Sequence, residues 1–416
     1  MTQIFYREGG MAIRQSATLA INERILARGA AGEPVLHLGF GEAGLPVPPE
    51  LAAVLADSVR HNDYGPVIGI PAAREAAAGY FTRRGLPTEP DQIVMAPGSK
   101  PLLFALLAVL PGDVVLPVPS WVSYAAQAAL LGRRVIGVPI PDRAGGVPDP
   151  DRLAAVARSA GVLILTLPDN PTGTLAPPDL LAEVCRIADD AGLVIISDEI
   201  YRDLSHTEFH SPAELSPDRT VITSGLSKSL ALGGYRIGFT RLPTPLRIGA
   251  DLVGVASEVW SSLASPMQRV AIAALTEPPE VTARIAASRR LHGTVSARVH
   301  RLLVRAGARC RPPEGGFYLY PDFGAHRESL AGQGIHTDRE LADLLLDRHG
   351  VGVLAGAEFG DDPHGLRFRV ATSLMYGSTD EQKLASLDSP DPLALPWIAD
   401  GLAHLARALA DVTRAG

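Results

Sequence analysis

The sequence predicts an α/β protein with a mostly parallel central sheet flanked by helices, followed by a smaller α+β domain. Two observations lead to this prediction. Through the middle of the chain, short runs rich in β-branched residues alternate with longer amphipathic segments, which is typical of strands joined by helical crossovers. Beyond about residue 243 long helical stretches replace this alternation, which indicates a second structural unit.

The expected strands of the large domain are continuous apolar runs, and such runs are typical of parallel strands that are covered on both faces. They lie at Ile93–Ala96, Val114–Val118, Arg134–Val138, Gly161–Thr166, Leu193–Ser197 and Thr220–Ser224. Helices are expected next, at Ala264–Leu275 and Pro279–Arg305, followed by short strands in FYLY, VGVL and LRFRV.

The strand-like run VLHLGF near the amino terminus stands apart from this series, so we assign it to the smaller domain. The expected organisation is an N-terminal arm with part of the small domain in residues 1–45, and a large domain in residues 46–275. The linking helix and the rest of the small domain are expected in residues 276–416.

The composition argues against several classes of protein. A net charge of −7 over 416 residues, without any run of five like charges, gives no electrostatic attraction for nucleic acid. The longest nearly uncharged stretch is interrupted by prolines into pieces too short to span a bilayer. The first ten residues do not have the pattern of a signal peptide, and Cys185 and Cys310 are expected as buried thiols in a reducing compartment. We therefore expect a cytoplasmic protein with no nucleic-acid or membrane partner.

Lysine is rare in this chain. Of the 38 basic residues only three are lysines, Lys100, Lys228 and Lys383. A guanidinium group stays protonated and cannot form an imine, whereas a lysine amine can lose its proton. Any chemistry that needs a reactive amine is therefore confined to these three positions.

Several chemically important side chains follow the expected strands, which is where ligands bind in open α/β sheets. Asp198 and Tyr201 lie in SDEIY, Asn170 in DNPTG, and Lys228 in SGLSKSL. Taken singly, each has a common structural explanation, such as a helix cap, a turn or a solvated lysine. Together with Arg236 they supply an amine for an aldehyde, a carboxylate for a ring nitrogen, donors for a phenolate and a cation for a phosphate. This combination predicts pyridoxal 5′-phosphate as the cofactor, and we expect no metal.

The order and spacing of these motifs carry a family resemblance. NPTG, SDEIY, SGLSK, an arginine eight residues after the lysine, and RFRVATS follow one another between about residues 36 and 373. In this respect the chain resembles the fold-type I pyridoxal phosphate enzymes, in particular the class I/II aminotransferase family of aspartate aminotransferase. The resemblance implies a homodimer with shared active sites. It also implies a ping-pong reaction that moves the amino group of an L-amino acid to a 2-oxo acid through pyridoxamine phosphate.

The resemblance also implies roles for the residues around the cofactor ring. Lys228 would form the imine with the cofactor aldehyde and, once released, would move the proton of the substrate α-carbon. Asp198 would pair with the pyridine nitrogen and keep it protonated. Tyr201 and Asn170 would donate hydrogen bonds to the ring oxygen O3′, and Trp121 in PSWVSY would stack on the ring.

The phosphate-binding residues follow from the same resemblance. APGSK precedes an apolar helix, so Gly98, Ser99 and Lys100 lie at a helix N-terminus, which favours an anion. A simple helix cap explains Ser99 equally well. Ser227 and Arg236 match further phosphate ligands. Tyr64 matches a tyrosine that would reach the phosphate of the neighbouring subunit.

For the substrate, Arg367 matches the arginine that binds the α-carboxylate, and Gly41 matches a glycine whose backbone supports the same group. Trp121 and Asn170 are also expected to border the substrate. Lys100 occupies a position where some family members contact a distal carboxylate and others do not, so the side-chain preference stays open. Arg369, two residues after Arg367, is either a second charge facing the substrate or an ion pair, and we favour the ion pair.

Two alternatives remain. Relatives with the same fold use the cofactor for elimination, cyclisation or oxidation of an amino acid, and the motifs do not exclude these reactions. A non-catalytic regulatory or binding protein that kept the fold is disfavoured, because every catalytic position is filled.

Overall fold

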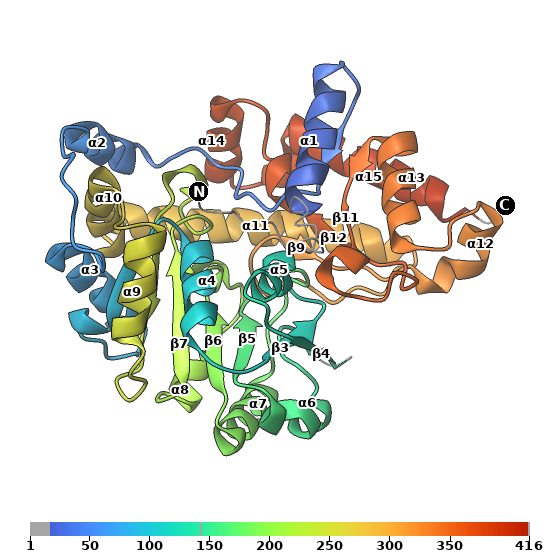
Figure 1. Cartoon of the computed structure of the whole chain (residues 1–416). Helices are drawn as coiled ribbons and strands as arrows, with labels where there is room; N and C mark the ends of the chain where they lie inside the picture. The colour runs from blue at the N-terminus through green and yellow to red at the C-terminus, as the bar shows by residue number, and fades with distance from the viewer. Residues whose placement is uncertain (1–16, 142–143, 415–416) are drawn as a thin grey trace, which may run out of the picture.

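The computed structural model describes residues 17–141 and 144–414, and its centre is a seven-stranded sheet (Figure 1). The first 16 residues, which belong to the predicted N-terminal arm, lie outside the described residues. The strand order is β2-β8-β7-β6-β5-β3-β4. The strands are β2 Ile93–Ala96, β3 Val114–Val118, β4 Val135–Pro139, β5 Val162–Thr166, β6 Val194–Asp198, β7 Thr220–Gly225 and β8 Gly238–Arg241.

The predicted fold class is confirmed. Strands β3 to β7 pair in parallel, and all six expected strands are present with boundaries close to those predicted. Strand β8 was not predicted as a strand and runs antiparallel to both β2 and β7. It has four residues and ends in Arg241, whose Nε donates to Thr88 Oγ1 at 2.9 Å. So short a run with a terminal charge gives a weak periodic signal.

Helices cover both faces of the large sheet because successive strand residues point to opposite sides. Ile164 of β5 and Ile196 of β6 pack in the apolar cluster that includes α4, whereas their neighbours Leu163 and Ile195 pack against α7. The helices of this part are α2 Pro49–Ser58, α3 Pro71–Thr82, α4 Ser99–Val109, α5 Val122–Leu130, α6 Pro150–Val156, α7 Pro178–Ala191, α8 Pro212–Leu215, α9 Gly249–Val259 and α10 Ser265–Leu275.

Helix α11, Pro279–Arg305, connects the large sheet to a second, smaller part. Figure 1 shows α1 and α13 to α15 on one side of α11 and the strands of the large sheet on the other. The helices of the smaller part are α1 Ala17–Ala30, α12 Arg327–Gly332, α13 Asp338–His349, α14 Asp380–Asp388 and α15 Pro396–Val412. Its strands are β1 Leu36–His37, β9 Tyr318–Leu319, β10 Val351–Gly352, β11 Leu354–Ala355 and β12 Phe368–Ala371.

The small strands form two further sheets. Strand β1 pairs in parallel with β10, and β11, β12 and β9 form an antiparallel sheet in that order. Leu36 and Leu38 pack in one apolar cluster with Val295 of α11, Leu345 of α13 and Leu405 of α15. The segment after α1 therefore packs against the carboxyl-terminal part of the chain. None of the helices among the described residues is long and apolar enough to cross a membrane.

The register of the parallel strands determines which side chains meet at their carboxyl ends. Thr166 of β5 lies beside Asp198 of β6, and Asp198 lies beside Thr223 of β7. Side chains from three distant parts of the sequence are thus placed at one edge of the sheet.

Candidate active site

A cavity of about 290 Å³ lies at the carboxyl ends of β5, β6 and β7, where they face β9 and β12 of the smaller part. Most of the predicted site residues line it: Gly41, Ser99, Lys100, Trp121, Asn170, Asp198, Tyr201, Ser227, Lys228 and Arg236. Gly98 lies next to the cavity, behind Arg236. Tyr64 and Arg367 are not among the lining residues.

Lys228 places a primary amine in the cavity wall, three residues after β7 ends. Its Nζ donates to the carbonyl oxygen of Gly41 at 2.6 Å. Burial lowers the pKa of Lys228 to about 8, and the positive charge of Arg369 contributes to this shift. The amine therefore loses its proton more readily than an exposed lysine, which favours nucleophilic attack on a carbonyl group.

Asp198 is 2% exposed, and its two carboxylate oxygens differ in their hydrogen bonding. Oδ2 accepts a hydrogen bond from the Tyr124 hydroxyl at 2.8 Å, and the same hydroxyl lies 2.7 Å from Thr166 Oγ1. Oδ1 is buried and has no hydrogen-bond partner within residues 17–141 and 144–414. Burial raises the pKa of Asp198 to about 6. A buried carboxylate oxygen without a partner is costly, so this atom suits an N–H donor from a ligand.

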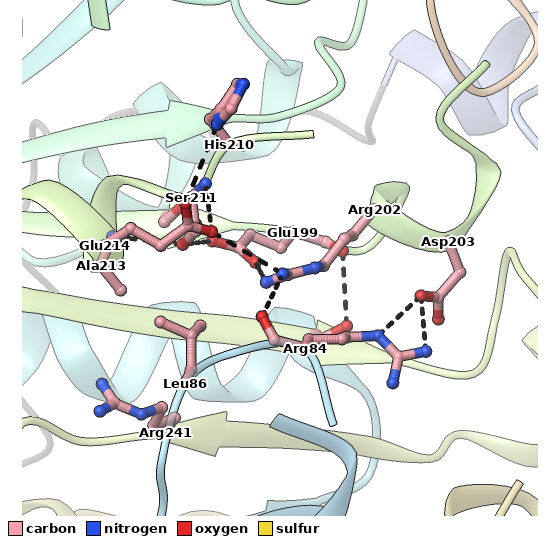
Figure 2. Close-up of polar contacts among 12 residues, drawn as sticks. Arg84, Leu86, Glu199, Arg202, Asp203, His210, Ser211, Ala213, Glu214 and Arg241 are labelled. Carbon is pink, nitrogen blue, oxygen red and sulfur yellow. Dashed lines mark hydrogen bonds and ion pairs between the residues drawn. The ribbon is translucent and has the colours of Figure 1, made fainter. Parts of the chain in front are cut away.

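The turn after Asp198 is held by a buried ion pair (Figure 2). Glu199 is 1% exposed and accepts hydrogen bonds from Arg202 Nη1 at 2.9 Å and from the hydroxyl of Ser211. Arg202 also donates to the carbonyl oxygen of Arg84 at 3.2 Å. Because Glu199 directly follows Asp198 and Arg202 directly follows Tyr201, their pairing restrains the turn that carries both side chains.

The Tyr201 hydroxyl lies 2.8 Å from the hydroxyl of Tyr318 in β9. Both side chains are buried, with 3% and 1% exposure. Gly41 leaves room for this pair, since a Cβ atom at position 41 would lie 2.2 Å from the Tyr318 oxygen. The tyrosine pair therefore requires a glycine at this position, whereas the contact to Lys228 uses only the backbone carbonyl oxygen.

At the other end of the cavity, the N-terminus of α4 meets the guanidinium of Arg236. Gly98 is the N-cap residue of α4 with φ = 97°, and a Cβ atom there would lie 2.3 Å from Arg236 Nη2. Arg236 Nη1 donates to the carbonyl oxygen of Gly233 at 2.7 Å, which orients the guanidinium. Ser99 and Ser227 add hydroxyl groups to the wall. A helix N-terminus beside a cation is suited to binding an anion such as phosphate.

Arg369 of β12 and Arg367, the residue before this strand, lie in places opposite to those predicted. Arg369 lines the cavity and is fully buried, and it donates to Asn170 Oδ1 at 3.0 Å and to the carbonyl oxygen of Gly39 at 2.8 Å. It forms no ion pair within the described part of the chain. Arg367 instead forms ion pairs with Asp322 at 3.1 Å and Asp361 at 2.9 Å, outside the cavity.

The ion pair favoured for Arg369 is therefore not present among the described residues, and Arg367, which was predicted to face the substrate, does not line the cavity. Both side chains lie on one face of the strand, so their alternation does not distinguish them. Two residues of a strand advance about 6.8 Å, which carries one arginine into the cavity and leaves the other beyond it. Of the two carboxylates that neutralise Arg367, Asp361 lies six residues before it, but Asp322 lies 45 residues before it, and a contact of that range leaves no local pattern.

Thr166, Tyr124 and Tyr318 are among the lining residues that were not predicted as site residues, and Arg369 lies in the wall although an ion pair was favoured for it. Tyr124 lies three residues after Trp121 and Tyr318 lies in the expected strand FYLY, so both had a local signal. The local pattern did not indicate their partners. Tyr124 contacts Asp198, which is 74 positions away, and Tyr318 contacts Tyr201, which is 117 positions away.

Comparison with known proteins supplies the family context. The family model described as "Aminotransferase class I and II" matches residues 33–376. The chain is 35% identical over 375 residues to an aspartate aminotransferase of Geobacillus stearothermophilus, which covers 87% of this chain and 93% of that protein. It is 34% identical over 386 residues to an aspartate/prephenate aminotransferase of Cereibacter sphaeroides, which covers 89% of this chain and 93% of that protein.

The chain is also similar to solved structures of aspartate aminotransferases. The aspartate aminotransferase from Thermus thermophilus with maleate superposes with a TM-score of 0.83 and 27% identity, covering 98% of this chain and 100% of that chain. The aspartate aminotransferase of Thermotoga maritima superposes with a TM-score of 0.80 and covers 96% of this chain and 98% of that chain. Its sequence identity is 24%, so this similarity shows a shared fold only.

Proposed function

Because the chain belongs to the class I and II aminotransferases, we propose that it moves the amino group of an acidic L-amino acid to a 2-oxo acid with pyridoxal 5′-phosphate bound in the cavity. One observation supports the cavity as the site of this cofactor. The low-pKa amine of Lys228 and the unpartnered oxygen of buried Asp198 line the same cavity. These are the two groups that the aldehyde and the ring nitrogen of this cofactor require.

The residues of the cavity fit the cofactor at each of its polar groups. Lys228 would hold the aldehyde carbon and Asp198 Oδ1 the ring nitrogen. Tyr201 and Asn170 would contact the ring oxygen O3′, and Trp121 would cover the ring face. The phosphate would lie between the N-terminus of α4 and Arg236, with Ser99 and Ser227 as further donors. When bound, the cofactor supplies an electron-accepting ring that stabilises negative charge on the substrate α-carbon.

Asp198 would keep the ring nitrogen protonated. Its pKa of about 6 leaves the carboxyl group mostly ionised at neutral pH, and a buried anion strongly favours a cationic neighbour. The hydrogen bond from Tyr124 fixes Oδ2, so Oδ1 is the oxygen that is directed to the ring.

Lys228 Nζ would move the proton of the substrate. An amine with a pKa of about 8 accepts a proton from the α-carbon and returns it without holding it too tightly, which suits a general base at neutral pH. The carbonyl oxygen of Gly41 holds the amine at the side of the cavity that Arg369 and Tyr318 also line.

Arg369 would bind the α-carboxylate. Its described hydrogen bonds go to neutral oxygens of Asn170 and Gly39, so its charge is not neutralised by them, and its Nε has no partner within the described residues. A planar guanidinium binds a carboxylate through two hydrogen bonds, which a lysine does not reproduce.

Lys100 would select the side chain of the substrate. Its Nζ lies 5.1 Å from the centre of the Trp121 ring, and no acidic partner is present for it in the parts of the chain that the structure describes. A free cation at the cavity wall favours a distal carboxylate. The names of the similar proteins, which refer to aspartate, support an acidic substrate.

The cofactor and reaction are tested by adding amino acids to the purified protein that carries pyridoxal phosphate. Acidic L-amino acids should convert the absorption spectrum to that of pyridoxamine phosphate, and a 2-oxo acid should restore it. Lys228→Ala should show neither change. Release of ammonia without a restorable spectrum would instead favour elimination, and a protein that binds no cofactor would contradict the proposal.

Arg369 in the cavity wall and Arg367 outside it give a matched pair of variants. Arg369→Lys should lower kcat/KM roughly 30-fold for every substrate, because losing a charge-assisted hydrogen bond costs about 2 kcal/mol. Arg367→Lys should change kcat/KM less than about fivefold, since partly exposed ion pairs contribute little. Steady-state kinetics with two amino acids measures both. A larger loss in Arg367→Lys would restore the original assignment.

The role of Lys100 is tested by comparing substrates. Lys100→Ala should lower kcat/KM for aspartate or glutamate roughly 30-fold, equivalent to about 2 kcal/mol, and leave alanine nearly unchanged. Lys383→Ala is the control, because Lys383 pairs with Asp380 on α14 and should affect neither substrate. Equal losses for acidic and neutral amino acids would show that Lys100 serves the cofactor phosphate or the helix start.

We also propose a homodimer with shared active sites. Tyr64 lies on the loop between α2 and α3 and is 93% exposed in the single chain, and Val59 at the end of α2 is 65% exposed. A partner subunit that covers this surface would bring Tyr64 to its phosphate. Sedimentation at the assay concentration should show a dimer, and Tyr64→Phe should weaken cofactor retention. A fully active monomer would contradict this proposal.

A further inference from the structure

We propose that Tyr318 is a positioning residue whose hydroxyl group donates to Tyr201 and thereby directs the Tyr201 hydrogen to the ring oxygen of the cofactor. This inference rests on the proposed function. Tyr318 belongs to β9 and would act on the cofactor only through Tyr201.

The geometry leaves the two hydroxyl groups as each other's partner. Their oxygens are 2.8 Å apart, and either one can donate. Each hydroxyl has a single hydrogen. The two residues come from different parts of the fold, since Tyr201 follows β6 of the large sheet and Tyr318 belongs to β9.

The direction of the hydrogen bond follows from the cofactor. A ring oxygen that carries negative charge has no hydrogen to give, so Tyr201 must donate to it. The hydrogen between the two tyrosines then comes from Tyr318. An oxygen that accepts a hydrogen bond polarises its own O–H, which makes Tyr201 a stronger donor.

Several contacts hold Tyr318 in this orientation. The guanidinium carbon of Arg369 lies 4.7 Å from the centre of its ring, and the ring of Phe317 lies 4.8 Å away. The missing side chain of Gly41 accommodates its hydroxyl. The charged groups near the two tyrosines are Arg369, Asp198 and Lys228, whose Nζ lies 5.8 Å from the centre of the Tyr201 ring. The ring of Tyr318 thus supports the proposed carboxylate site, while its hydroxyl serves the cofactor side.

The test is a pH titration of the absorption spectrum of the protein that carries the cofactor. Without the Tyr318 hydroxyl, Tyr201 donates more weakly, the ring oxygen keeps more negative charge, and the neighbouring imine nitrogen holds its proton more tightly. Tyr318→Phe should therefore move the spectral midpoint upward by roughly 0.5 pH unit. Tyr201→Phe should move it further in the same direction.

Tyr320→Phe is the matched control. Tyr320 lies two residues further along the chain, but its hydroxyl donates to Asp361 at 2.9 Å and does not line the cavity. Its loss should leave the midpoint unchanged. Tyr318→Phe retains the ring beside Arg369, so KM for the amino acid should change less than about twofold, whereas Tyr318→Leu should raise KM severalfold.

Gly41→Ala gives a second, independent variant, because the added methyl group displaces the Tyr318 hydroxyl without removing it. It should also raise the midpoint. An unchanged or lowered midpoint in Tyr318→Phe, with the expected shift in Tyr201→Phe, would overturn the inference. A wild-type protein that shows no pH-dependent cofactor spectrum would contradict the proposed function instead.

Discussion

The buried carboxylate of Asp198 is the constraint on which the rest of the site depends. Placing a charge at the end of β6 is costly, and the fold offsets this cost for one oxygen through the Tyr124 hydroxyl. The second oxygen is buried without a partner among the described residues, and Asp198 is one of the residues that line the cavity. A ligand with a cationic N–H group would complete the hydrogen bonding, so the cost of burial favours binding of the proposed cofactor.

The surrounding structure keeps the other groups at fixed positions relative to Asp198. The parallel register sets Thr166 beside it, and the buried pair of Glu199 and Arg202 holds the turn to Tyr201. The smaller part of the chain closes the cavity with Tyr318 and Arg369. Contacts between the two parts therefore join the cofactor side of the cavity to the proposed carboxylate side.

Much of this arrangement could be predicted from the sequence. The strands were predicted from their apolar runs, and Asp198, Asn170 and Lys228 were predicted as site residues because they follow strands of one parallel sheet. Arg367 and Arg369 mark the limit of such reasoning. The choice between them depends on where β12 meets the cavity, on Asp361 six residues before Arg367, and on Asp322, which approaches from 45 residues away. Long-range contacts of this kind leave no local pattern.

In the proposed site, Asp198 orients the cofactor and Arg369 orients the substrate in one cavity. A crystal structure of the protein with pyridoxal phosphate and a dicarboxylate inhibitor tests it most directly. We expect the ring nitrogen within hydrogen-bond distance of Asp198 Oδ1 and a carboxylate bound by the guanidinium of Arg369. A ring nitrogen directed away from Asp198, or a carboxylate bound by Arg367, would contradict it.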